Sequence, residues 1–159
     1  RSRAVVHCAL RERHGIPQTM MKATIEWQDK VHFTATAGTG HTVPMDGPPD
    51  AGGGNRGARP MELVLMGLGG CSSFDVVNIL TKSRQNVVGC VTEVAGERAE
   101  EVPQVFTRIH LHFRVTGRQL DERKVARAVS LSAEKYCSAS IMLQRGGVAV
   151  THSYEVAEA

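Results

Sequence analysis

Residues 67–80 read GLGGCSSFDVVNIL and place one thiol, Cys71, inside an apolar run that carries three glycines. Pro60 stands where a first helical residue would, and apolar side chains then recur at helical spacing, which predicts a helix over about 60–82. Residues 63–70 are apolar nearly all round, as in helices buried inside a protein. Three helical glycines cost roughly 2–3 kcal/mol unless close packing offsets the loss. We therefore expect a central helix that another backbone, most simply a second helix, approaches closely.

Strand-like segments precede this helix. Residues 22–38 are rich in Thr, Val, Ile and aromatic residues around a polar interruption, which predicts a β-hairpin. Residues 38–46 can add a third short strand. Residues 46–59, DGPPDAGGGNRGAR, are almost all turn formers and predict an irregular loop rather than a domain linker.

The sequence after the helix predicts a second sheet. Residues 90–101 and 105–117 alternate as strands, and in the second segment apolar side chains face one way while Arg and His face the other. Asp121 can cap a further helix, and a short helix is expected after Cys137. A final strand is predicted at 148–156.

The order of strands, helix, strands, helix and strand predicts the α+β class. A chain of 159 residues fits one hydrophobic core. Residues 1–20, which end at the first residue of the doubled Met20–Met21, are interpreted as an N-terminal extension. Its origin stays open between upstream coding sequence, non-native sequence and a real part of the protein. Residues 21–159 are then expected to form a single domain.

Charge and hydropathy exclude several classes of partner. The formal net charge of +3 comes entirely from the arginine-rich extension, so the neutral remainder offers no field for nucleic acid. The extension lacks the apolar core of a signal peptide, and glycines and polar residues interrupt the longest apolar run. We expect a cytoplasmic protein with neither a membrane nor a nucleic-acid partner.

The cysteines are too sparse for a disulfide scaffold and have no C-x-x-C pairing of the kind found in structural zinc sites. Two histidines on one face of the second sheet, His110 and His112, are interpreted as solvent-facing rather than as metal ligands. No metal centre and no cofactor are expected. The thiols to be explained are Cys8, Cys71, Cys90 and Cys137.

Two of these cysteines lie beside serines in apolar surroundings, in GGCSS at Cys71 and in KYCSAS at Cys137. They can meet if the later helix packs on the first. A peroxidatic pair needs such a meeting, because the sulfenic acid formed on one sulfur must condense with the other. Spacing alone leaves this open, since 66 residues separate them, and the alternative is that Cys71 is an apolar filler.

Three segments, RPMELVLMGLGGCSSFDVVNIL, LSAEKYCSASIML and THSYEV, resemble the OsmC/Ohr superfamily of peroxide-resistance proteins, most closely its YhfA-like branch. The resemblance covers essentially residues 21–157. It implies an OsmC-like fold in an intertwined homodimer, with antiparallel sheets packed around central helices. It also implies that Cys71 is the peroxidatic residue and Cys137 the resolving residue.

The sequence departs from the peroxidase branches near the start of the helix. There the residue after the motif proline is a glutamate that orients an activating arginine, whereas this chain has Met61, with Glu62 one place later. Arg56 and Arg59 are the nearby cationic candidates. Asp75, one turn from Cys71, would disfavour a thiolate if it were ionised.

Two functions remain open. The first is cysteine-dependent reduction of organic hydroperoxides in oxidative stress, with a cellular dithiol as reductant. The second is a non-catalytic protein of the same fold that binds a small apolar or thiol-reactive molecule, favoured by the missing Arg/Glu pair. A purely structural dimer would leave the paired cysteine motifs unexplained.

Overall fold

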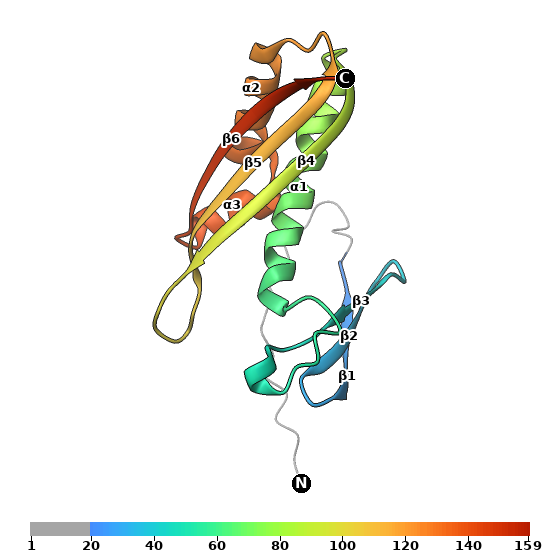
Figure 1. Ribbon diagram of the computed structural model, residues 1–159, viewed down its shortest axis with the longest axis vertical. Helices are drawn as coiled ribbons and strands as arrows, with labels where there is room; N and C mark the ends of the chain where they lie inside the picture. The colour runs from blue at the N-terminus through green and yellow to red at the C-terminus, as the bar shows by residue number, and fades with distance from the viewer. Residues whose placement is uncertain (1–19) are drawn as a thin grey trace, which may run out of the picture.

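Two three-stranded sheets and one long helix organise residues 20–159, which are the part of the chain that the computed structural model describes (Figure 1). The predicted extension, residues 1–20, lies outside this part except for its last residue. The α+β class expected from the order of elements is confirmed.

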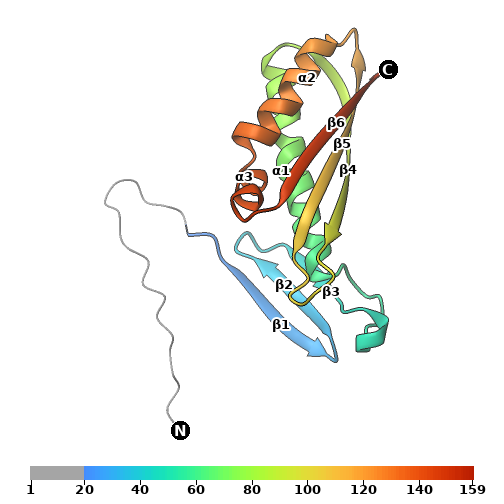
Figure 2. The same ribbon diagram turned by 90° about the vertical axis from the view of Figure 1, so that its left-hand side faces the viewer.

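The N-terminal sheet consists of β1 (Ala23–Asp29), β2 (His32–Ala37) and β3 (Thr42–Met45), all antiparallel. The hairpin and the third short strand are therefore present as predicted. β1 is exposed along its whole length, including Ile25 and Trp27. The sheet stands away from the rest of its own chain (Figures 1 and 2) and makes almost no contact with the other elements.

The C-terminal sheet consists of β4 (Asn86–Arg98), β5 (Phe106–Arg118) and β6 (Ala149–Glu158). β4 pairs antiparallel with β5, and β6 lies parallel to β5. The predicted alternation in β5 holds, because one set of alternate side chains faces the helices and is fully buried. This set comprises Ile109, Leu111, Phe113 and Val115.

Three helices cover one face of the C-terminal sheet (Figure 2). α1 (Pro60–Lys82) has the bounds that the spacing predicted and packs on β4. α2 (Glu122–Leu131) begins where Asp121 accepts a 2.9 Å hydrogen bond from the Arg123 N–H. The π-helical turn η2 (Ser132–Tyr136) and α3 (Ser138–Arg145) follow. The core lies between these helices and the sheet.

The close approach predicted at the glycines of α1 is made at Gly69 by a strand of the same chain. A Cβ added at Gly69 would lie 2.9 Å from Cγ2 of Val94 in β4, whereas one added at Gly67 or Gly70 would meet nothing within 4 Å. The predicted full burial of α1 is also wrong for the single chain, since one face of the helix is exposed. Phe74 on that face is 71% exposed.

α1 is long and apolar enough to cross a membrane. Length and composition alone therefore do not support the expectation that the chain has no membrane-spanning segment. One face of this helix packs on β4, α2 and α3 within the chain. Serine and aspartate side chains of the helix face protein neighbours rather than a uniform apolar surrounding.

Candidate functional site

The two cysteines singled out by their motifs lie together in the folded chain. Cys71 is on the third turn of α1, and Cys137 is the residue that precedes α3. Their Sγ atoms and a carboxylate oxygen of Asp75 all lie within 4.8 Å of one another. A disulfide bond is about 2.05 Å long, so the two sulfurs would have to approach each other by less than about 3 Å to form one.

The geometry of the cluster follows from helix periodicity and from one tertiary contact. Cys71 and Asp75 are four residues apart on α1, which places both side chains on the same helix face. That face packs against η2 and α3, which deliver Cys137. Burial raises the pKa of the Asp75 carboxyl, and no hydrogen bond from the described residues offsets this effect.

Hydrogen bonds from two serines hold the Cys137 sulfur. The Ser72 hydroxyl donates to Cys137 Sγ over 3.2 Å, and the Ser140 backbone N–H donates over 3.4 Å. Burial nevertheless raises the pKa of the Cys137 thiol, and these two hydrogen bonds oppose the shift. The Ser132 hydroxyl donates to the Ser72 carbonyl at 3.1 Å and joins η2 to α1.

These serines are site residues that sequence reasoning did not assign. The signal was present, because serine adjoins both cysteines in GGCSS and KYCSAS. The buried serines Ser72, Ser132 and Ser140 are each fully inaccessible to solvent, so their hydroxyls need partners within the protein. They find these partners at Cys137 and at the backbone around it.

The two sulfurs differ in their exposure to solvent. Cys71 is half-buried, whereas Cys137 is fully buried. An open cleft of about 500 Å³ has Asp75, one helical turn from Cys71, and Tyr136, the residue before Cys137, in its wall. Of the two sulfurs, that of Cys71 is the more accessible to solvent.

The cationic candidates lie away from the thiols within this chain. Arg56 forms ion pairs with Asp29 at the end of β1 and with Asp46 in the loop. Arg59 precedes α1, about 18 Å along the helix axis from Cys71. Its backbone N–H donates to Glu62 over 2.9 Å, so this glutamate caps the helix. No arginine contacts the thiols among residues 20–159.

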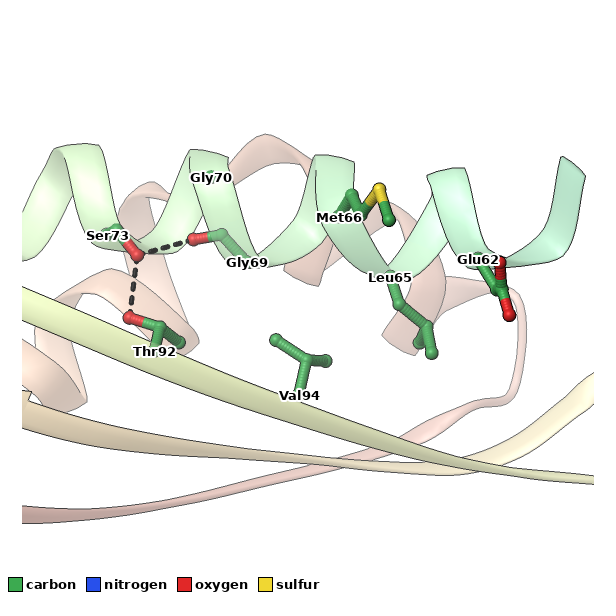
Figure 3. A pocket seen from close by; sticks show the side chains of 8 residues that line it. All are labelled: Glu62, Leu65, Met66, Gly69, Gly70, Ser73, Thr92 and Val94. Atoms are coloured by element: carbon green, nitrogen blue, oxygen red, sulfur yellow. Dashed lines mark hydrogen bonds between the residues drawn. The ribbon is translucent and has the colours of Figure 1, made fainter. Parts of the chain in front are cut away.

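A second cavity of about 600 Å³, the Leu65 groove, opens between α1 and β4. Figure 3 shows Leu65 and Val94 pointing into it, with the hydrogen-bonded pair Ser73–Thr92 at one end and Glu62 at the other. No cysteine is among its lining residues, which are Glu62, Leu65, Met66, Gly69, Gly70, Ser73, Thr92 and Val94.

Asp46 organises the glycine-rich loop that leads into α1. Its side chain is inaccessible to solvent and accepts hydrogen bonds from the backbone N–H groups of Gly47, Gly54 and Arg56 at 2.9, 2.9 and 3.0 Å. The N–H of Arg56, followed by those of Gly54 and Gly47, holds the pKa of the Asp46 carboxyl below its usual value. Asp46 therefore has a structural role before α1.

Replacing Asp46 with asparagine should lower the unfolding midpoint at pH 7 by several degrees, because an amide cannot accept all three hydrogen bonds. The pKa of Asp46 is lower in the folded state than the value of about 3.9 in the unfolded chain. Its carboxylate therefore stabilises the fold fully above about pH 3.9, and this stabilisation is lost as the pH falls through the folded-state pKa. The difference between D46N and wild type, measured by circular dichroism, should therefore shrink below about pH 4. Asp50→Asn, an exposed change in the same loop, is the matched control, and equal midpoints for D46N and wild type at pH 7 would contradict this role.

The side chains of His110, His112 and Cys90 are engaged by neighbouring residues of the C-terminal sheet or of the core. His110 Nε2 and His112 Nδ1 each lie 2.8 Å from the Ser153 hydroxyl on the outer face of the C-terminal sheet, and His110 Nδ1 lies 2.8 Å from the Thr151 hydroxyl. Cys90 packs against the core from β4. Burial raises the pKa of its thiol.

Fold and site together define a dithiol protein of the two-sheet α+β type, in which a long central helix carries the more accessible thiol. The sequence profile of the family described as OsmC-like protein matches residues 52–153. The chain belongs to this family, as the resemblance of its motifs implied.

Known relatives extend the likeness to almost the whole described chain. Protein YhfA of Escherichia coli (strain K12) is 50% identical over 139 residues, which are 87% of this chain and 100% of that protein. The crystal structure of a hypothetical protein from Aquifex aeolicus VF5 has a TM-score of 0.77 at 28% identity, covering 89% of this chain and 99% of that one. The organic hydroperoxide resistance protein OhrB of Bacillus subtilis, at 20% identity, shares the fold, with a TM-score of 0.60 over 87% and 100% of the two chains.

Proposed function

We propose that this protein is a cysteine-dependent peroxidase that reduces organic hydroperoxides through Cys71 and Cys137. The observation that carries the proposal is the meeting of two sulfurs, 66 residues apart in sequence, within 4.8 Å. Membership of the OsmC-like family supports it, as does the likeness of fold to organic hydroperoxide resistance proteins. The difference in burial between the sulfurs supports Cys71 as the attacking residue, because peroxide must reach the attacking sulfur first.

In the proposed reaction the Cys71 thiolate attacks one oxygen of the hydroperoxide. The O–O bond breaks, Cys71 becomes a sulfenic acid, and the alkoxide takes a proton to leave as the alcohol. The Cys137 sulfur then attacks the sulfenic sulfur, an S–S bond forms, and water leaves. The two thiols have supplied two electrons and two protons, and an external dithiol must restore both.

We further infer that a second copy of the chain covers the exposed face of α1, giving the homodimer that the family resemblance implies. Phe74 and Met66 expose large apolar side chains on this face, and the open spaces at Gly67 and Gly70 leave room for another backbone. The detached N-terminal sheet, with Trp27 exposed, suits a chain whose sheet packs on its partner.

A non-catalytic binding protein is the second candidate, and the position of the arginines favours it. A buried thiol needs a nearby positive group to gain thiolate character, and Arg56 is engaged by Asp29 and Asp46 instead. The Leu65 groove would then be the binding cavity, closed by a partner chain. This protein would bind an apolar ligand there without turning over peroxide.

Exposure of the reduced protein to one equivalent of cumene hydroperoxide separates these candidates. We expect peptide mapping without reductant to show a Cys71–Cys137 disulfide, because the two sulfurs are within reach of each other. Cys90, partly buried on β4, is the internal control and should stay a free thiol. Two separately and slowly oxidised cysteines, with no linking disulfide, would contradict the peroxidase and favour the binding protein.

A further inference from the structure

We propose that Cys71, Asp75 and Cys137 form a three-ligand binding site for a thiophilic divalent cation, with Zn²⁺ as the ion that fits best. This goes beyond the proposed peroxidase, because it assigns the same cluster a second chemistry. It also differs from the expectation of no metal centre, which considered closely spaced cysteines and the pair His110 and His112. The ligands here come from two elements that meet through folding.

The donor atoms suit tetrahedral zinc. Zinc binds thiolate at about 2.3 Å and carboxylate oxygen at about 2.0–2.2 Å, so neighbouring ligand atoms in a tetrahedral site lie roughly 3.5–3.8 Å apart. The three atoms already lie within 4.8 Å of one another, so each pair would have to approach by no more than about 1.3 Å. The helix provides Cys71 and Asp75 on one face, and the start of α3 provides Cys137 opposite them.

The hydrogen bonds around Cys137 are those expected of a metal-bound thiolate. Its sulfur accepts from the Ser72 hydroxyl and the Ser140 backbone N–H, and such outer contacts orient a ligand and stabilise its negative charge. Ser72 is itself oriented through the Ser132 hydroxyl at its carbonyl. The ligand is thus positioned before any ion arrives.

The charges of the cluster are a second reason to expect a bound cation. Two sulfurs and a carboxylate converge in a partly buried place, and no Lys or Arg among residues 20–159 forms an ion pair with Asp75. A divalent cation would neutralise this cluster of groups, each of which is anionic when it is deprotonated. Three protein ligands leave a fourth position for water or for an external thiol.

Metal binding and disulfide formation exclude each other at this site. Binding of Zn²⁺ displaces the protons of both thiols and keeps both sulfurs reduced. Oxidation by a hydroperoxide removes two electrons from the sulfurs, forms the S–S bond and releases the ion unchanged as Zn²⁺. The redox state of the pair therefore controls the occupancy of the site.

The site is tested by titrating the full reduced chain with Zn²⁺ by calorimetry and with Co²⁺ by absorption, in a Cys8→Ser, Cys90→Ser background that leaves only the paired thiols. We expect one ion per chain and a thiolate-to-cobalt charge-transfer band. Asp75→Asn should weaken Zn²⁺ binding by at least about tenfold, the scale found even for loss of an outer-shell partner. Asp50→Asn is the matched control and should bind as the background protein does.

The outcomes distinguish this site from the peroxidase. Zn²⁺ affinity that D75N leaves unchanged, or a disulfide-linked protein that binds as tightly as the reduced one, would overturn the three-ligand site even if peroxide still forms the disulfide. One-to-one, Asp75-dependent binding without any peroxide-induced disulfide would support the metal site while contradicting the peroxidase. Circular dichroism of D75N confirms that lost binding is not lost folding.

Discussion

Replacing Cys71 with serine should reduce the rate of hydroperoxide reduction by at least about a thousandfold, the scale expected when a catalytic nucleophile is lost. A serine hydroxyl can neither form a sulfenic acid nor take part in a disulfide, so no bond in the proposed reaction can form. The measurement is the loss of cumene hydroperoxide with dithiothreitol as the reductant. Serine fits the space of the half-buried thiol, so the fold should survive.

Two further substitutions make this result specific. Cys90→Ser removes a partly buried thiol on β4 that does not belong to the cluster of Cys71, Asp75 and Cys137. It should leave the rate within about twofold of wild type, since most changes outside a functional feature have small effects. Cys137→Ser should still form a sulfenic acid on Cys71, which dimedone can trap, but should fail to form the disulfide. A C71S rate equal to that of wild type would remove Cys71 from any catalytic role.

Replacing Phe74 with glutamate should convert the proposed dimer into a folded monomer. The side chain is 71% exposed in the single chain, so the substitution costs little within one subunit. In a two-fold interface the same change occurs twice and buries two carboxylates of like charge. Loss of a central aromatic contact alone costs about 2 kcal/mol or more, which is roughly 30-fold in the dissociation constant.

Analytical ultracentrifugation checks this prediction, with wild type expected at twice the chain mass and F74E at the mass of one chain. Val102→Glu, at a 90% exposed position in the loop between β4 and β5, is the matched control and should stay dimeric. A monomeric wild-type protein, or an F74E variant that remains dimeric, would contradict the placement of the second copy on this face of α1.

Much of the fold could be predicted because its signals are local. Pro60 and the helical spacing after it indicate α1 with its observed bounds, and Asp121 indicates the start of α2. The alternation in residues 105–117 predicts which face of β5 is buried. Each signal acts within one or two helical turns or along a single strand, where backbone geometry alone decides which side chains share a face.

The candidate site could be predicted only in part. The residues Cys71 and Cys137 are recognisable from their motifs, and the family resemblance assigns them roles. Their neighbours are less readable, because Ser72 reaches Cys137 across a contact between α1 and the start of α3, although Ser140 binds it locally from within α3. The sequence predicts that a helix packs closely on the glycines of α1, whereas β4 packs on Gly69. A glycine indicates that another segment lies close, but not whether that segment is a helix or a strand.

The elements, their order and the faces that alternate along them can be predicted from the amino-acid sequence, because each follows from side-chain periodicity on a short stretch of backbone. The convergence of two sulfurs and the Asp75 carboxylate, and the pairing of Arg56 with Asp29 and not with a thiol, become visible in the folded chain alone. Such contacts join residues far apart in the chain. They are decided when the apolar faces of helices and sheet are buried together, a balance over the whole core that no local pattern encodes.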